Sequence, residues 1–303
     1  MPKTNKNFLN LTLSKTTSSF LSAIQVGSQL KIHSLYKNSA NITIDNNYLL
    51  NLQFKDGLLA TRAALVDLQG TDKEELKKRL KGVGKVEEDS ICFSAIKFSF
   101  KESAVIDNTE EKVLQGISCS FEELKVKAKK MLNFLKLVEC NSIFLNNILD
   151  NKISSFIDSD FEKKLYREVS SKLKELKRSL RKGNETIITD TLRDLIGLGP
   201  GLTPSGDDFS IGFYSIRKVL NQKFKLELIN PKMLGNVSNF SFISTCLLND
   251  IEESFYPEIF IRILGLILGF ELEDFFEEFK KIKDFGHTSG EDLLAGILFG
   301  IIN

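Results

Sequence analysis

The spacing of apolar residues in this 303-residue chain changes once, near residue 110. Before that point apolar and polar residues alternate, which is typical of half-buried β-strands. The runs that alternate are 30–36, 40–44, 48–54 and 91–100. We expect 58–66 to form a strand or a turn of helix, and 72–81 to form a short charged helix. The sequence up to about residue 110 therefore predicts a mostly antiparallel β domain.

After residue 110 the period is near 3.6, which predicts helices. One helix is expected over 121–138, with Ser120 and Glu123 as a capping box. A longer one runs from Phe161 through Leu180 to a stop at Gly183. Its other face is basic and is expected to be solvated, because the interleaved aromatic residues of a nucleic-acid surface are missing. Further helices are expected over 187–196, 207–220, 236–249, 258–268, 272–281 and 291–302.

These patterns predict an α+β fold. We expect a β-rich antiparallel domain at residues 1–110 and a larger all-helical domain at residues 111–303. The length fits one large or two medium domains. Since no low-complexity linker separates the two parts, we expect them to pack together.

The composition excludes several classes of protein. Lys and Arg number 41 against 40 Asp and Glu, so a polyanion-binding protein is not indicated. The four cysteines, Cys92, Cys119, Cys140 and Cys246, are far apart, which favours buried thiols in a reducing compartment over disulfides or a zinc site. The N-terminus is a poor signal peptide, and the apolar run Ile263–Phe270 is too short to cross a bilayer. We expect a soluble, cytoplasmic protein.

One short pattern occurs twice in the helical part. Ser205–Gly212 recurs as Ser289–Gly296, with the shared form Ser-Gly-acid-Asp-apolar-x-x-Gly. Each copy opens an apolar helix, so each offers a hydroxyl and two carboxylates at a helix N-terminus. We expect 199–208 and 287–292 to meet in space and form one site. If the two helix starts point apart, this prediction fails.

The first copy follows a glycine-rich loop, Gly197–Pro204, in which glycines alternate with other residues. Such a loop can present backbone N–H groups to an anion, because no Cβ blocks the approach. It is not a Walker loop, since no Lys follows the glycines, and it is not a dinucleotide fingerprint, since a helix precedes it.

Other interpretations of the repeat stay open. Ser205 with Asp208, and Ser289 with Asp292, match capping boxes, so the repeat can be purely structural. Magnesium is a possible cofactor, because hard cations prefer carboxylates. Its candidate ligands are Asp207, Asp208, Glu291 and Asp292.

Of the two histidines, one is a candidate site residue and the other is not. His287 lies two residues before Ser289 and is a candidate proton donor or acceptor, or a second capping side chain. His33 lies in a predicted strand without acidic neighbours, and we expect no function for it. A hydrolase triad of Ser205, His287 and Asp208 can be formed on paper, but the nucleophile-elbow pattern is absent.

The run Gly197–Phe209, followed by Gly286–Gly290, resembles a bacterial family long labelled as a domain of unknown function. One branch of that family is the AllH-type subunit of oxamate carbamoyltransferase, from the anaerobic allantoin pathway. The resemblance implies a subunit of an enzyme that converts carbamoyl phosphate and oxamate into oxalurate and phosphate. It also implies FdrA-like and AllG-like partner subunits. The balanced charge and the lack of a membrane-spanning run lead us to expect no nucleic acid or membrane partner.

The site chemistry suits this reaction, because carbamoyl transfer builds negative charge that N–H groups at helix starts can stabilise. The candidate catalytic residues are Ser205, Asp208, His287 and Ser289. The candidate anion-binding residues are Gly199, Gly201, Thr203, Gly206, Asp207, Thr288 and Gly290. Two alternatives remain: a non-catalytic binding or assembly subunit whose motif is structural, and a stand-alone hydrolase that uses Ser205.

Overall fold

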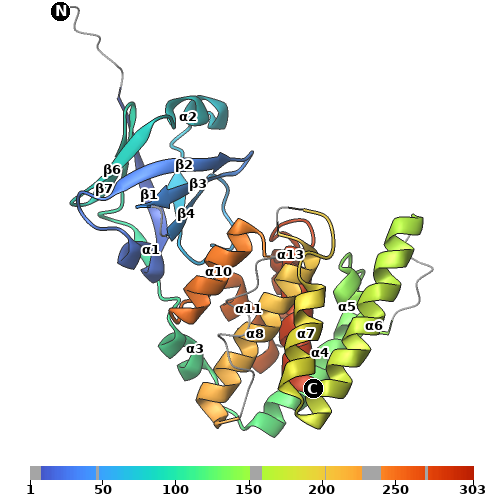
Figure 1. Cartoon of the computed structure of the whole chain (residues 1–303). Helices are drawn as coiled ribbons and strands as arrows, with labels where there is room; N and C mark the ends of the chain where they lie inside the picture. Colours follow the sequence, from blue (N-terminus) through green and yellow to red (C-terminus); the bar gives the residue numbers. More distant parts are fainter. Residues whose placement is uncertain (1–7, 46–47, 151–158, 202, 227–239, 270–271) are drawn as a thin grey trace, which may run out of the picture. The chain divides into compact units, whose positions relative to one another are not determined.

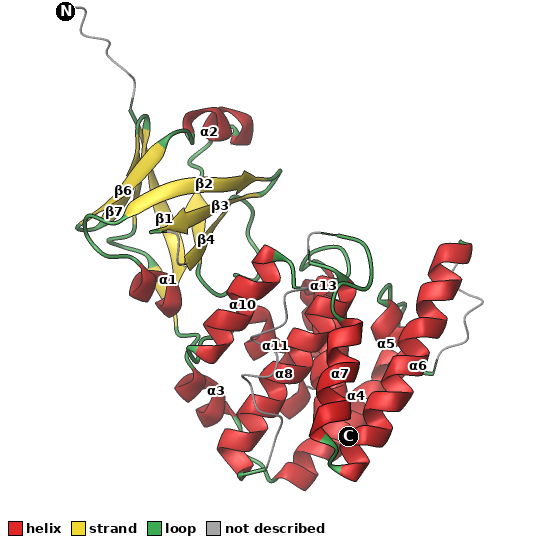
Figure 2. Ribbon diagram, in the orientation of Figure 1, coloured by secondary structure: helices red, strands yellow, loops and turns green. Residues whose placement is uncertain are grey.

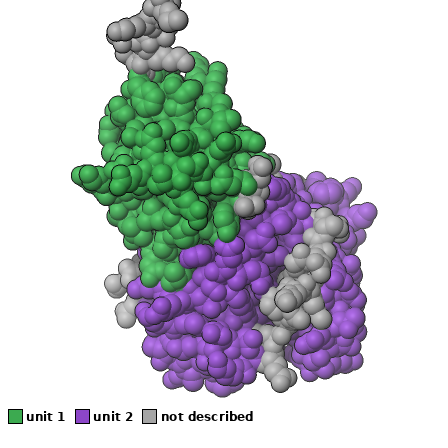
Figure 3. All heavy atoms as spheres, turned by 60° about the vertical axis from the view of Figure 1, so that its left-hand side comes forward, with its two compact units in different colours: residues 1–109 green, residues 110–303 purple. Residues whose placement is uncertain are grey.

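The computed structural model describes residues 8–45, 48–150, 159–201, 203–226, 240–269 and 272–303. The chain divides into two compact units, residues 1–109 and 110–303 (Figure 3). All the strands described lie in the first unit, and the second is helical (Figure 2). An α+β fold is thereby confirmed, while the packing of one unit on the other stays a prediction.

The strands of the first unit are β1 Leu9–Thr17, β2 Gln29–Leu35, β3 Ser39–Ile44, β4 Tyr48–Gln53, β5 Ala63–Asp67, β6 Val83–Glu87, β7 Ser90–Phe93, β8 Ile96–Ser99 and β9 Ala104–Ile106. Two short helices accompany them, α1 Ser18–Ala23 and α2 Lys73–Arg79. The strand order is β5-β4-β3-β2-β6-β7-β8-β1-β9. A further pairing of β1 with β5 closes the first eight of these strands into a barrel.

The predicted mostly antiparallel β domain is confirmed in part, because six of the nine strand pairings described are antiparallel. The sheet is nevertheless mixed, since β4–β5, β1–β8 and β1–β9 are parallel pairs, and its closure into a barrel was not predicted. The segment 54–62 connects β4 to β5, and the two strands pair in parallel. Alternating side chains such as Leu11, Leu13 and Ile42 fill the interior of the barrel.

The run 91–100, expected as one strand, is a hairpin of β7 and β8. Its turn consists of Ser94 and Ala95, and a single serine without Gly, Asn, Asp or Pro beside it is a weak turn signal. Phe93 and Ile96 are both buried, so the two-residue turn shifts the alternation of buried and exposed side chains by one position.

The helices of the second unit are α3 Glu110–Gly116, α4 Phe121–Leu135, α5 Ile143–Ile148, α6 Asp160–Lys182, α7 Glu185–Leu195, α8 Ser205–Phe224, α10 Phe242–Glu252, α11 Glu258–Gly269, α12 Leu272–Lys283 and α13 Ser289–Ile302 (Figure 1). The short helices α3 and α5 were not predicted. The helix expected over 236–249 begins at Phe242, and its predicted first residues, 236–239, lie outside the described residues.

Several local predictions are confirmed. Ser120 and Glu123 form the expected capping box of α4. Gly183 ends α6 in the left-handed conformation with φ 63°. Leu165 and Leu176 lie on the buried face of α6, whereas Phe161, one turn earlier, is 64% exposed and does not belong to that face.

Helices α8 and α13 form the centre of the helical unit. Every residue of α13 from Gly290 to Ile301 is buried, as expected of a helix that is apolar on all sides. Phe209 stacks on Phe144 at 4.8 Å and lies 5.8 Å from Phe299, between ring centroids. Among the described residues, no helix is long and apolar enough to cross a membrane.

All four cysteines are free thiols. Cys140 is buried as predicted, while Cys92, Cys119 and Cys246 are half-buried.

Candidate functional site

The two copies of the repeat meet in space. The hydroxyls of Thr203 and Ser289 lie 3.3 Å apart, and those of Ser205 and Thr288 lie 3.4 Å apart. Both pairs are within hydrogen-bond distance. The expectation that 199–208 and 287–292 come together is therefore confirmed.

The two helices run in the same direction from this meeting point. A Cβ on Gly212 would lie 2.3 Å from the Leu293 carbonyl oxygen, and one on Gly296 would lie 2.1 Å from the Phe209 carbonyl oxygen. These contacts are equivalent under exchange of the two copies, so α8 and α13 are related by an approximate two-fold axis. Since both N-termini lie at one end, the positive ends of the two helix dipoles lie together there.

Gly206 and Gly290 have matching roles. A Cβ on Gly206 would lie 1.8 Å from the Leu195 carbonyl oxygen at the end of α7. A Cβ on Gly290 would lie 2.0 Å from the Ile282 carbonyl oxygen near the end of α12. The second residue of each copy is therefore glycine because the preceding helix passes against the backbone.

The capping-box interpretation is wrong. The N-caps of α8 and α13 are Pro204 and Thr288, and neither makes a side-chain capping bond. Ser205 and Ser289 are the first residues of their helices, one position too late to cap. Their hydroxyls instead face the other helix start.

The first acid of each copy accepts backbone N–H groups. Asp207 accepts from Gly197 at 2.8 Å and from Ser241 at 3.2 Å. Glu291 accepts from Asn141 and Ser142, both at 2.6 Å. These two carboxylates thus hold the glycine loop and the starts of α10 and α5 against the helix starts.

The second acid of each copy faces the other copy. Asp208 is 6% exposed and lies beside the hydroxyls of Ser289 and Thr203. Asp292 is fully buried and lies beside those of Ser205 and Thr288. Within the described part of the chain, the Oδ2 atom of each aspartate is buried without a hydrogen-bond partner. Each carboxyl group thus meets the serine of the opposite copy.

One contact breaks this symmetry. The Ser142 hydroxyl donates to Asp292 Oδ1 at 2.5 Å and also caps α5 by accepting from Leu145 N. Sequence reasoning missed Ser142. A serine just before the apolar run 143–145 is a weak sign of a helix start, but nothing local signals its contact with Asp292.

Burial raises the pKa of these acids. Loss of solvent raises the pKa of Asp292 to about 7, against the lowering effect of the hydroxyls of Ser142, Thr288 and Ser205. Burial is also the main cause that raises the pKa of Asp208 well above its ordinary value, and the negative charge of Asp292 adds to it. Burial also raises the pKa of Glu291, although its two backbone donors oppose the shift. Both aspartates therefore keep a proton to higher pH than an ordinary aspartate does, and at neutral pH Asp292 is near its midpoint.

Two of the predicted backbone donors are used inside the chain. Gly206 N donates to Leu198 O at 2.8 Å, and Gly290 N donates to Phe285 O at 3.1 Å. Gly199 and Gly201 have φ of 101° and 113°, a conformation that favours glycine. Among the described residues, their N–H groups make no hydrogen bond to the protein.

The histidines lie outside this cluster. His287 is exposed, and no hydrogen bond joins it to Ser205 or Asp208, all three being within the described ranges. The triad geometry of a hydrolase is therefore not formed. His33 is exposed on β2 beside the Ser34 hydroxyl at 3.0 Å.

The four carboxyl groups do not fit a shared magnesium site. Asp207 and Glu291 are occupied by backbone N–H groups. In the ranges that the structure covers, no group of three or more His, Cys, Asp or Glu side chains is arranged to hold a metal ion.

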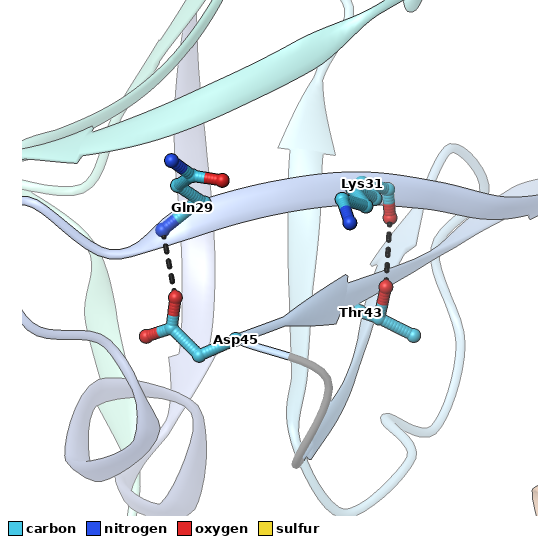
Figure 4. Close-up of a pocket in the computed structure, with 4 residues that line it drawn as sticks. All are labelled: Gln29, Lys31, Thr43 and Asp45. Carbon is cyan, nitrogen blue, oxygen red and sulfur yellow. Dashed lines mark hydrogen bonds between the residues drawn. The ribbon is translucent and has the colours of Figure 1, made fainter.

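A shallow hollow also lies on the barrel, lined by Gln29, Lys31, Thr43 and Asp45 (Figure 4). Asp45 accepts from Gln29 N at 2.9 Å, and Thr43 donates to Lys31 O at 3.4 Å. Most of these side chains are exposed, and the hollow belongs to the unit that lacks both helix starts. We assign it no role.

Residues 195–301 match the model of the family described as "Oxamate carbamoyltransferase subunit AllH". The matched segment runs from the end of α7 to the end of α13 and includes both copies of the repeat. Over this segment, about a third of the chain, the sequence is similar to that family, in agreement with the resemblance seen in its motifs. Neither the curated proteins nor the solved structures give a match.

Proposed function

We propose that this chain, AllH-like over residues 195–301, is a subunit of a carbamoyltransferase whose paired helix starts bind a small anionic substrate. The observation that carries the proposal is the meeting of the two helix starts. There, hydroxyls and two buried carboxyl groups with unpartnered oxygens gather inside the matched segment. Capping and packing do not account for those unpartnered atoms, since a buried polar atom without a partner is costly.

The reaction that the family name implies is transfer of a carbamoyl group from carbamoyl phosphate to oxamate. In this proposal Ser205, Ser289 and Thr203 supply hydroxyls, and Gly199 and Gly201 supply backbone N–H groups. The parallel dipoles of α8 and α13 place partial positive charge at the same end, which favours an anion and the charge that develops on the carbamoyl oxygen. Holding the acceptor there, beside a donor bound by the assembled complex, would also lower the entropic cost of their encounter.

Proton transfer needs an acid and a base. Asp208, in which burial raises the pKa and so favours the protonated form, is the proposed acid, and Asp292 takes the role of base that the sequence did not assign to it. His287 stays a candidate only at the exposed edge of the site. The proposed partners are FdrA-like and AllG-like subunits, with carbamoyl phosphate as the donor.

A second candidate is a non-catalytic binding or assembly subunit. It is favoured by the glycines of the repeat, because Gly206, Gly212, Gly290 and Gly296 each meet backbone from a neighbouring helix. In that case the repeat would exist to hold the helical unit together, and catalysis would belong to the partners.

Phosphate release from carbamoyl phosphate by the reconstituted complex tests the proposal. We expect the double variant Ser205→Ala/Ser289→Ala to lose most of this activity while its melting temperature stays within a few degrees of the wild type. Ser120→Ala, which removes a cap on α4 outside the site, is the matched control and should stay active. A fully active double variant would refute the catalytic proposal. Loss of stability and of complex formation together would favour the assembly role.

A further inference from the structure

We propose that the paired carboxyl groups of Asp208 and Asp292 bind the amide end, –CO–NH₂, of a small amide-bearing carboxylate, and do not bind the phosphate of the carbamoyl donor. This inference rests on the proposed function and names the substrate that this chain holds. It assigns phosphate recognition to another part of the complex.

The charges at the site argue against phosphate. Four carboxyl groups surround the helix starts: Asp207, Asp208, Glu291 and Asp292. Of the cations in the described ranges, the one that pairs with them is Lys283, whose Nζ lies 3.7 Å from Glu291 Oε1. A phosphate dianion placed beside the aspartates would meet negative charge, and in the described residues no cation pairs with either aspartate; Gly206 N and Gly290 N already donate within the chain.

The unpartnered atoms argue for an amide. Among the buried atoms without a hydrogen-bond partner in the described residues, Asp208 Oδ2 and Asp292 Oδ2 belong to the second acid of each copy, and Glu291 Oε1 lies at the same helix start. An ionised carboxyl only accepts hydrogen bonds, whereas a protonated one also donates one. A ligand that satisfies such a pair must bring N–H donors together with an acceptor, and the amide group carries both on adjacent atoms.

Ser142 decides which aspartate does which task. Its hydroxyl donates to Asp292 Oδ1, so it favours the ionised, accepting form of that group, while Asp208 has no equivalent serine from α5. Asp208 is then the member that keeps the proton, in agreement with its strongly raised pKa. Asp292 would accept from the amide nitrogen, and Asp208 would donate to the amide oxygen.

The carboxylate end of the ligand has a separate place. In the described residues, the N–H groups of Gly199 and Gly201 are not used inside the protein. Gly199 lies directly against Ser205, because a Cβ on it would be 3.1 Å from the Ser205 Cβ. An amide-bearing carboxylate can thus be bound by the glycine loop at one end and by the aspartates at the other.

Binding to the full-length chain, without partners and with EDTA present, tests the inference by calorimetry at pH 8. The probes are oxamate, oxalate and inorganic phosphate. Oxalate is nearly the same shape as oxamate but replaces the –NH₂ group by a negative oxygen. We expect oxamate to bind at least about tenfold more tightly than oxalate, because oxalate leaves the acceptor on Asp292 unmatched and adds repulsion. Phosphate should bind more weakly than oxamate.

Two isosteric variants separate the aspartates. Asp292→Asn turns an –NH₂ group toward the amide nitrogen and should weaken oxamate binding by about tenfold or more. Asp208→Asn keeps a donor and an acceptor, so oxamate affinity should change less than about threefold. Asp160→Asn removes a fully exposed carboxylate and serves as the charge control, with unchanged binding.

Tighter binding of oxalate or phosphate than of oxamate would overturn the inference, as would equal loss in both aspartate variants. Failure of all three probes to bind the wild-type chain would also overturn it. These outcomes are independent of carbamoyl transfer, which is measured as phosphate release by the complex. The inference can thus fail while the proposed function stands, and binding of oxamate can persist if transfer is not observed.

Discussion

The substitution Gly296→Ala tests the arrangement on which the site depends. Gly296 lies on α13 where that helix crosses α8. An alanine Cβ there would lie 2.1 Å from Phe209 O and 2.7 Å from Phe213 N, both backbone atoms of α8. Real Cβ atoms essentially never approach other heavy atoms to under 3.0 Å, so the two helices must separate by close to 1 Å at this point.

The energetic cost follows from what must move. A backbone clash cannot be relieved by rotation of a side chain, so the packing between two buried helices loosens around the crossing. Overpacking a core typically costs about 1–3 kcal/mol and occasionally more. We expect a loss near or above the upper end, about 3 kcal/mol, because the Cβ contacts backbone at two places.

Gly265→Ala is the matched control. Gly265 lies inside α11 and is exposed, and an alanine Cβ at this position would meet no neighbouring atom within 4 Å. Alanine there should stabilise the helix by about 0.5–1 kcal/mol. Urea unfolding followed by circular dichroism at 222 nm measures both variants. If Gly296→Ala lies within about 0.5 kcal/mol of the wild type, the close parallel crossing of α8 and α13 is refuted.

Three further predictions concern stability. Because the pKa of Asp292 is raised, the folded state keeps a proton that the unfolded state loses above pH 3.8. The free energy of unfolding should therefore fall by roughly 4 kcal/mol for this group as the pH rises from 3.8 through about 7. Unfolding at pH 5 and at pH 8 samples this fall, and Asp292→Asn should remove the part that belongs to Asp292. Ser142→Ala should lower the free energy of unfolding by about 1–3 kcal/mol, because it removes both a helix cap and the donor to Asp292. Ser142→Thr keeps the hydroxyl and should retain most of that stability, so equal losses in the two variants on denaturation would contradict the hydroxyl's role. Gly183→Ala should destabilise the end of α6 by about 1 kcal/mol, since φ there is 63°, and an unchanged melting temperature would argue against that conformation.

The helical part of the fold was the more predictable from sequence. Its signals are local: Ser120 with Glu123 starts α4, and Gly183 stops α6. The barrel was less predictable, because its closure depends on the pairing of β1 with β5, which no local pattern reveals. The residues of β1 alternate between apolar and polar, yet no strand was predicted over them.

The candidate site was also predictable only in part. The repeat predicted that Ser205 and Ser289 would come together, and they do. It did not predict that both serines begin their helices instead of capping them, which places them opposite the other copy's aspartate. The contacts of Ser142 and Asn141 with α13 were beyond prediction, since these residues lie 150 positions before their partners.

That separation along the chain bears on how the protein folds. The two residues that precede α5 and touch the site, together with the first turn of α13, enclose nearly half of the chain between them. Contacts so distant in sequence form only after the intervening helices have been brought together, because closing a long loop costs entropy before any contact is gained. We therefore expect the cluster around Asp208 and Asp292 to assemble in the last stages of folding, so a ligand that binds there recognises only chains whose helical unit is complete.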